Sequence, residues 1–159
     1  MKSGISYLVY LLSWIVIALV SCNDKNDNPA QTLQLIRVKT DDIILSNTQL
    51  ISDIPVNSSF FIEFTSAVDT TSAKKNIYLI SAPNNDKVSC EFEFTDENKT
   101  IILTPSNPLI NESDYLLEIT RGLKGSKKEN FLGVKYEFKT EPGILKLLSA
   151  TLNGSALSS

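Results

Sequence analysis

The sequence predicts an all-β protein, an antiparallel β-sandwich of about seven strands preceded by an export signal. From Thr32 onward, apolar and polar residues alternate with a period of two, which is typical of strands with one buried face and one wet face. Turn-forming residues separate these segments about every 8 to 14 positions. The third observation is an apolar run at the N-terminus that has the layout of an export signal.

Residues 1–21 are predicted to be a signal peptide. Lys2 precedes an apolar run that ends at Val20, and this run is shorter than the ~20 residues that a membrane-spanning helix needs. Ser21 and Cys22 follow at once, and then the chain becomes polar. An uncleaved membrane anchor and a secreted protein with a chance cysteine are the alternatives.

Leu19, Val20, Ser21 and Cys22 resemble the lipobox of bacterial lipoproteins. The resemblance implies cleavage before Cys22, attachment of diacylglycerol to its sulfur, and acylation of the new amino terminus, with palmitate as the expected label. Two or three acyl chains anchor a protein stably, whereas one chain alone is marginal.

A polar tether is predicted over residues 22–32, because so few apolar residues cannot offset the entropy of ordering a backbone. Its acidic segment, 23–29, is similar to the one that follows the lipid cysteine in bacteroidete-type surface lipoproteins. This similarity implies a lipid-anchored protein of the outer membrane that faces the cell exterior. A plain solvated linker is the alternative.

One domain is predicted over residues 33–141, with its strands justified by local pattern. At 60–65, Phe60, Ile62 and Phe64 alternate with more polar neighbours, and the same alternation recurs at 88–94, 115–119 and 134–139. Shorter apolar runs predict the remaining strands at 33–38, 77–80 and 101–103. The turn clusters lie at 52–55, 82–86, 96–99 and 122–133. Asp69 is a suitable N-cap for one helical turn that reaches Lys75.

Five segments in order carry a resemblance to a known family. They are 61–69, 76–79, 99–105, 109–119 and 136–140. Together they resemble the bacterial Ig-like domain of the S-layer-protein type (bacterial Ig-like family five), from about Leu33 to Thr140, which implies an Ig-like sandwich. The loop 122–133 departs from the family pattern, because a lysine-rich segment stands where the family favours an Asp-Gly-type turn.

Residues 142–159 are predicted to begin a second Ig-like repeat. The segment Leu145–Ala150 echoes Leu33–Val38, 112 residues earlier, which is about the length of one sandwich domain. The chain is therefore expected to be a fragment of a longer protein. The alternative is an edge strand of the same sandwich followed by a tail.

Composition excludes several chemistries. The chain has no histidine, which removes the usual general base and any histidine metal ligand, and its net charge of -3 offers no basic field for nucleic acid. Cys90 is expected to be a buried small hydrophobe, because no histidine exists to activate it. Glu91 and Glu93 are expected on a solvated sheet face.

Other candidate sites are also weak. Asp41, Asp42 and Asp69 lack further spaced oxygen ligands for calcium. The basic loop with Lys124, Lys127 and Lys128 is expected to be a solvated turn. Three tyrosines fall mainly on strand faces predicted to be packed, which disfavours a flat sugar-binding platform: Tyr78, Tyr115 and Tyr136. No catalytic, cofactor-binding or metal-binding residue is therefore predicted, and no cofactor.

The sequence thus predicts a non-enzymatic, lipid-anchored Ig-like module that acts as a cell-surface spacer or interaction domain. Its expected partners are the membrane, through the lipid anchor, and a glycan or a protein. The alternative is the N-terminal stalk of a larger surface carbohydrate-active enzyme or glycan-binding lipoprotein, and a weaker one is an adhesin.

Overall fold

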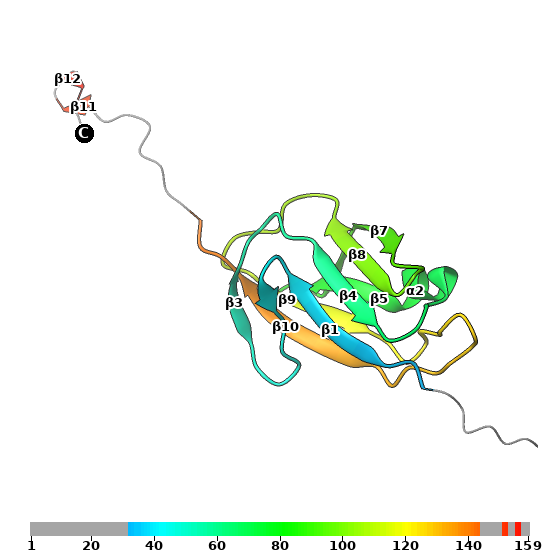
Figure 1. Ribbon diagram of the computed structural model, residues 1–159. Helices are drawn as coiled ribbons and strands as arrows, with labels where there is room; N and C mark the ends of the chain where they lie inside the picture. Colours follow the sequence, from blue (N-terminus) through cyan, green and yellow to red (C-terminus); the bar gives the residue numbers. More distant parts are fainter. Residues whose placement is uncertain (1–31, 144–150, 153–154, 157–159) are drawn as a thin grey trace, which may run out of the picture. The chain divides into compact units, whose positions relative to one another are not determined.

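The computed structural model describes residues 32–143, 151–152 and 155–156, with side chains over 32–143 (Figure 1). Ten strands and one short helix make up residues 32–143. They are β1 (Leu35–Thr40), β2 (Ile43–Ile44), β3 (Ile51–Ile54), β4 (Phe60–Phe64), α2 (Thr70–Asn76), β5 (Ile77–Ser81), β6 (Asp86–Val88), β7 (Cys90–Thr95), β8 (Thr100–Pro105), β9 (Asp114–Ile119) and β10 (Val134–Thr140). Near the C-terminus, β11 (Thr151–Leu152) pairs antiparallel with β12 (Ser155–Ala156).

The strands form two five-stranded sheets that pack face to face, which confirms the predicted β-sandwich (Figure 1). Sheet 1 has the order β2-β1-β4-β8-β7, and sheet 2 has the order β3-β10-β9-β5-β6. Sheet 1 is antiparallel throughout, whereas β3 joins sheet 2 in parallel to β10. The chain crosses from one sheet to the other after β2, β3, β4, β6 and β8, and the remaining consecutive strands share a sheet.

Aromatic rings fill the space between the sheets. Phe60, on sheet 1, and Phe138, on sheet 2, are fully buried, with ring centroids 5.1 Å apart. Tyr115 stacks on the other side of Phe138 at 5.6 Å, and its hydroxyl accepts a hydrogen bond from the Ile110 N–H at 3.0 Å. The predicted alternation at 60–64 is confirmed, since Phe60, Ile62 and Phe64 are all buried.

The helix is also confirmed. Asp69 has extended backbone angles, and its Oδ1 accepts a hydrogen bond from the Ser72 N–H at 2.7 Å, as an N-cap does. Two lysines, Lys74 and Lys75, lie in the last turn, where positive charge complements the helix dipole.

The number of strands differs from the prediction, because edge strands are defined by partners far away in sequence. Residues 52–55 were expected to turn, yet β3 forms there by pairing with β10, with Ile51 opposite Phe138. The expected strand at 88–94 is instead two strands, since β6 pairs with β5 in one sheet and β7 with β8 in the other. The break falls at Ser89, whose carbonyl accepts a hydrogen bond from the Ser106 N–H at 2.9 Å.

The predicted second repeat falls largely outside the described residues, which omit 144–150, and it stays a prediction. The same holds for the signal peptide and for most of the tether, because residues 1–31 are outside the description. Within the described ranges, no helix has the length and apolarity needed to cross a membrane.

Replacing Phe138 should cost most of the stability of the sandwich. We expect Phe138→Ala to lower the free energy of unfolding by about 3 to 5 kcal/mol, because it leaves a cavity between the two sheets. The control is Ile36→Ala, at a side chain that is 57% exposed, which should change it by less than about 0.5 kcal/mol. Equilibrium unfolding in urea measures both, and equal losses in the two variants would contradict the proposed core.

Candidate functional site

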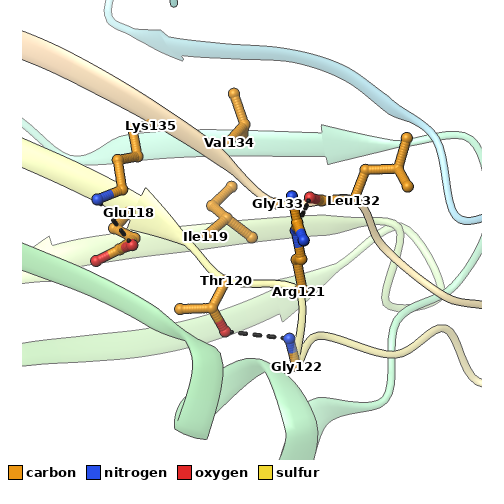
Figure 2. Close-up of a pocket in the computed structure, with 9 residues that line it drawn as sticks. All are labelled: Glu118, Ile119, Thr120, Arg121, Gly122, Leu132, Gly133, Val134 and Lys135. Atoms are coloured by element: carbon orange, nitrogen blue, oxygen red, sulfur yellow. Dashed lines mark hydrogen bonds and ion pairs between the residues drawn. The ribbon is translucent and has the colours of Figure 1, made fainter.

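A depression with a volume of about 530 Å³ lies where β9 and β10 separate (Figure 2). Beyond the last cross-strand pair, Ile119 with Val134, the chain opens into the loop 120–133. Gly133 closes this loop with a φ of +82°, a conformation that glycine adopts without strain. The depression is lined by Glu118, Ile119, Thr120, Arg121, Gly122, Leu132, Gly133, Val134 and Lys135.

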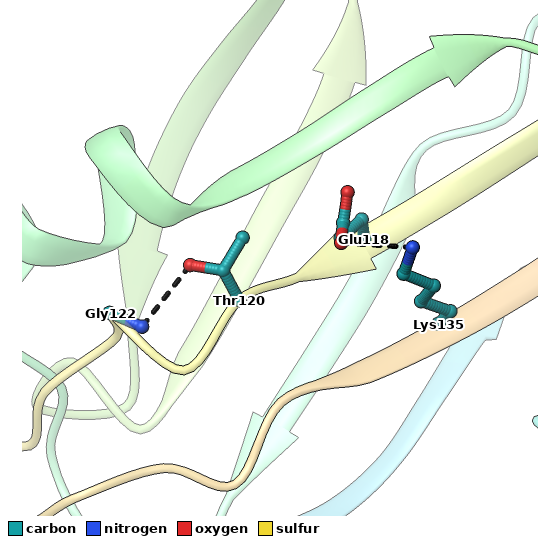
Figure 3. Close-up of polar contacts among 4 residues, drawn as sticks. All are labelled: Glu118, Thr120, Gly122 and Lys135. Atoms are coloured by element: carbon teal, nitrogen blue, oxygen red, sulfur yellow. Dashed lines mark hydrogen bonds and ion pairs between the residues drawn. The ribbon is translucent and has the colours of Figure 1, made fainter.

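The polar groups around this depression bind one another. The Lys135 Nζ lies 3.2 Å from the Glu118 Oε1, across the β9–β10 pair (Figure 3). Arg121 donates a hydrogen bond from its Nε to the Leu132 carbonyl at 3.1 Å, as Figure 2 shows. The Thr120 Oγ1 accepts a hydrogen bond from the Gly122 N–H at 3.2 Å (Figure 3). These contacts hold the loop base in place.

A second depression, of about 430 Å³, lies on the outer face of sheet 2. Its apolar part includes Leu50, Ile80 and Leu116, and its polar part includes Asp114 and Glu137. Leu50 is 55% exposed, so this surface is partly apolar and open to solvent.

The loop 120–133 is folded as a compact platform. Leu123 and Phe131 anchor it in the core, and the Phe131 ring meets the Phe64 ring edge-on at 5.9 Å. The Glu129 carboxylate is buried beneath the turn, where its Oε2 accepts a hydrogen bond from the Lys127 N–H at 2.8 Å. A Cβ at Gly125 would lie 2.2 Å from that same oxygen, so the missing side chain makes room for the carboxylate.

Hydrogen bonds also tie this loop to segments that are distant in sequence but adjacent in the fold. The Ser126 N–H donates a hydrogen bond to the Ala67 carbonyl at 2.8 Å, and the Lys124 N–H donates to the Ser72 Oγ at 2.9 Å. Lys127 and Lys128 are exposed on its surface, and so is Arg121 at its base. The predicted basic turn is thus held in one conformation by hydrogen bonds, and it exposes its basic side chains to solvent. The lysines of this turn were predicted as solvated, whereas the buried position of Glu129 and the hydrogen bond of Arg121 to the Leu132 carbonyl were not predicted.

Cys90 is half-buried against the core rather than fully buried as predicted. Burial raises the pKa of its thiol to about 11, so very little thiolate exists near neutral pH. Its position on β7, the edge strand of sheet 1, explains the difference in exposure.

The acidic candidates remain separate from one another. Glu91 and Glu93 are both exposed on the outer face of β7, as predicted. Asp69, considered above as a calcium ligand, is the N-cap of α2, where its side chain accepts a hydrogen bond from the Ser72 N–H. In residues 32–143, no group of three or more Asp, Glu or Cys side chains is gathered as metal ligands would be.

The tyrosines largely follow the prediction. Tyr115 and Tyr136 are buried, at 3% and 7% exposure. Tyr78 is different, because it lies on the outer face, where the Lys87 Nζ sits 3.4 Å from the centre of its ring. That lysine covers the ring, so it is not a free platform for a sugar.

The predicted lipidation site lies outside the described residues. Cys22 and the lipobox residues Leu19, Val20 and Ser21 all fall within 1–31. Their role stays a prediction from sequence.

Several solved structures are similar to this chain. The chain is similar to the N-terminal part of the bacterial S-layer protein SbsC, with 19% identity and a TM-score of 0.49, over 82% of this chain and 33% of that one. It is also similar to alpha-2-macroglobulin of E. coli in its native conformation (15% identity, TM-score 0.51, 70% of this chain and 6% of that one). CopC from Methylosinus trichosporium gives 13% identity and a TM-score of 0.51, over 72% of this chain and 98% of that one.

These likenesses concern the fold alone, and the chain spans about a third of the length of the S-layer fragment. None of the curated proteins matches the sequence. The sequence model of the bacterial Ig-like domain matches residues 46–140, from just before β3 to the end of β10, which is more than half of the 159 residues. The expected resemblance is confirmed, and the chain belongs to the bacterial Ig-like domain family.

Proposed function

We propose that this chain is a non-catalytic Ig-like module, anchored by a lipid on Cys22, that acts as a spacer or interaction domain at the outer surface of the cell. The observation that carries the proposal is the order of the parts. A lipobox-like segment ends at Cys22, and a sandwich with a filled core begins ten residues later at Thr32. A rigid module so close to a membrane anchor suits a spacer.

The non-catalytic part of the proposal is supported by the state of the polar groups. Glu118 is paired with Lys135, and Glu129 is used within its own loop. The raised pKa of Cys90 disfavours a nucleophilic thiolate. No histidine exists anywhere in the chain to act as a base.

An interaction role is supported by the outer face of sheet 2. Ile80, Leu116 and Leu50 offer an open apolar area beside Asp114 and Glu137. A protein or glycan partner would contact this mixed surface through apolar burial and hydrogen bonds.

A second candidate function is a stalk for a larger surface enzyme or glycan-binding lipoprotein. The echo of Leu33–Val38 at Leu145–Ala150 favours it, since tandem sandwich domains repeat at this spacing. The open reading frame beyond Ser159 separates the two: a further domain with paired carboxylates supports the enzyme stalk, whereas Ig-like repeats alone support a spacer.

The lipid anchor makes a direct prediction. Cells that express the chain should incorporate radiolabelled palmitate into it, and Cys22→Ser should abolish the label. Cys90→Ser is the matched control, because it removes the other cysteine and should leave the label unchanged. Label that persists in Cys22→Ser, or is absent from the natural chain, would refute the anchor.

The thiol of Cys90 should react slowly while the domain is folded. The pKa of about 11, raised from 9.0, lowers the thiolate fraction at pH 8 about 100-fold, so the reaction with a disulfide reagent should be slower than that of a free cysteine by up to that factor. Because the thiolate is the reactive form, the rate should rise as the pH approaches 11. The measurement uses Cys22→Ser, so that Cys90 is the sole thiol, and compares the folded chain with the chain in urea. Equal rates in the two conditions would show that the thiol is not protected.

A further inference from the structure

The chain enters the sandwich beside the basic loop. The Leu33 N–H donates a hydrogen bond to the Asn130 carbonyl at 2.9 Å, and Thr32 forms a parallel bridge with the same residue. In Figure 1, β1 begins next to the loop that joins β9 to β10, and β10 runs to the opposite end of the sandwich. The loop 120–133 thus pairs with the first described residues of the domain, Thr32 and Leu33.

Positive charge is concentrated at this end of the sandwich. We define the basic end as the segments 65–76, 96–99 and 120–133, which connect strands there. It holds seven basic and four acidic residues, and one of those acids, Glu129, is buried. The basic residues are Lys74, Lys75, Lys99, Arg121, Lys124, Lys127 and Lys128. The rest of residues 32–143 holds five basic and twelve acidic residues, so the domain is otherwise strongly negative.

The opposite end of the sandwich has the reverse charge. We define the acidic end as the segments 41–42, 55–59, 82–85, 106–113 and 141–143. These loops contain four acidic residues and no lysine or arginine. The charge separation therefore lies along the strands, with the positive pole where the chain enters and the negative pole where β10 ends.

We infer that the basic end docks on the anionic, phosphate-bearing lipid headgroups of the membrane that holds Cys22, and that this contact orients the sandwich. The inference rests on the proposed lipid anchor. Charge complementarity selects the occupant, because lysine and arginine side chains on a fixed loop suit a surface of phosphates. The acidic end faces away from the same surface, since like charges repel.

The chain length permits this contact. Nine residues, 23–31, separate Cys22 from Thr32, and the ten steps between these two residues span at most about 35 Å when extended. Attraction to an anionic surface acts within about 8 Å at physiological salt, so the loop must approach closely to feel it. Tethering keeps the loop within reach, and each lysine near the surface then favours docking by roughly fivefold.

The test uses the full chain, processed and acylated by the cell and then reconstituted into vesicles. The vesicles contain phosphatidylcholine alone or phosphatidylcholine with phosphatidylglycerol. A neutral acetylating reagent modifies exposed lysines, and mass spectrometry gives the rates at Lys127, Lys128 and Lys75 relative to Lys87, which lies outside the basic end. We expect several-fold protection of the three lysines in the anionic vesicles only, and its loss at high salt.

Two double variants test the role of the loop. Lys127→Gln/Lys128→Gln should reduce the protection of Lys75, whereas the matched control Lys39→Gln/Lys139→Gln, with the same change in net charge and both lysines outside the basic end, should not. Equal reduction in both would overturn the inference, and so would equal rates in the two vesicle types. A chain without acyl groups contradicts the proposed function and this inference with it. An acylated, vesicle-bound chain whose basic end is unprotected contradicts this inference alone.

Discussion

The contact of Phe138 with Phe60 and Tyr115 is the interaction on which the two layers depend. Phe60 belongs to β4 of sheet 1, and the other two rings belong to β9 and β10 of sheet 2, so the cluster joins two sheets that are not hydrogen-bonded to each other. Because these rings fill the interior, the inward positions around them are mostly apolar, with small hydroxyl side chains such as Thr140 as the exceptions. Charged side chains can therefore lie only on the outer faces and in the loops at the two ends.

This constraint explains how a lysine-rich loop is held in one shape. The loop 120–133 reaches into the same interior with Leu123 and Phe131. Its one acidic side chain, Glu129, turns inward to accept a hydrogen bond from the loop backbone, so its charge is withdrawn from the surface. The lysines then remain as the outward groups, supported by a turn that is tied to the core at both of its ends.

Local pattern was sufficient for the elements that bury one face. The strand at 60–64 and the N-cap at Asp69 depend on neighbouring residues, and both could be read directly. The edge strands could not, because β3 exists only through its partner β10, far along the chain, and the change of sheet at Ser89 breaks no local rule. The basic loop was recognised as a row of lysines. The position of this loop beside Thr32 could not be predicted, because the bridge between Thr32 and Asn130 joins residues that are distant in sequence.

The positions at which the chain enters and leaves the domain give the charge separation a direction relative to the chain. β1 begins at the basic end and β10 finishes at the acidic end, so the chain enters and leaves the domain at opposite poles. On an anionic membrane, attraction of the basic end and repulsion of the acidic end would favour the same orientation of the domain. Both would hold whatever follows Gly143 away from the lipid surface. A module anchored next to its positive pole therefore needs no stiff tether to stand upright, because its own charges supply the orientation.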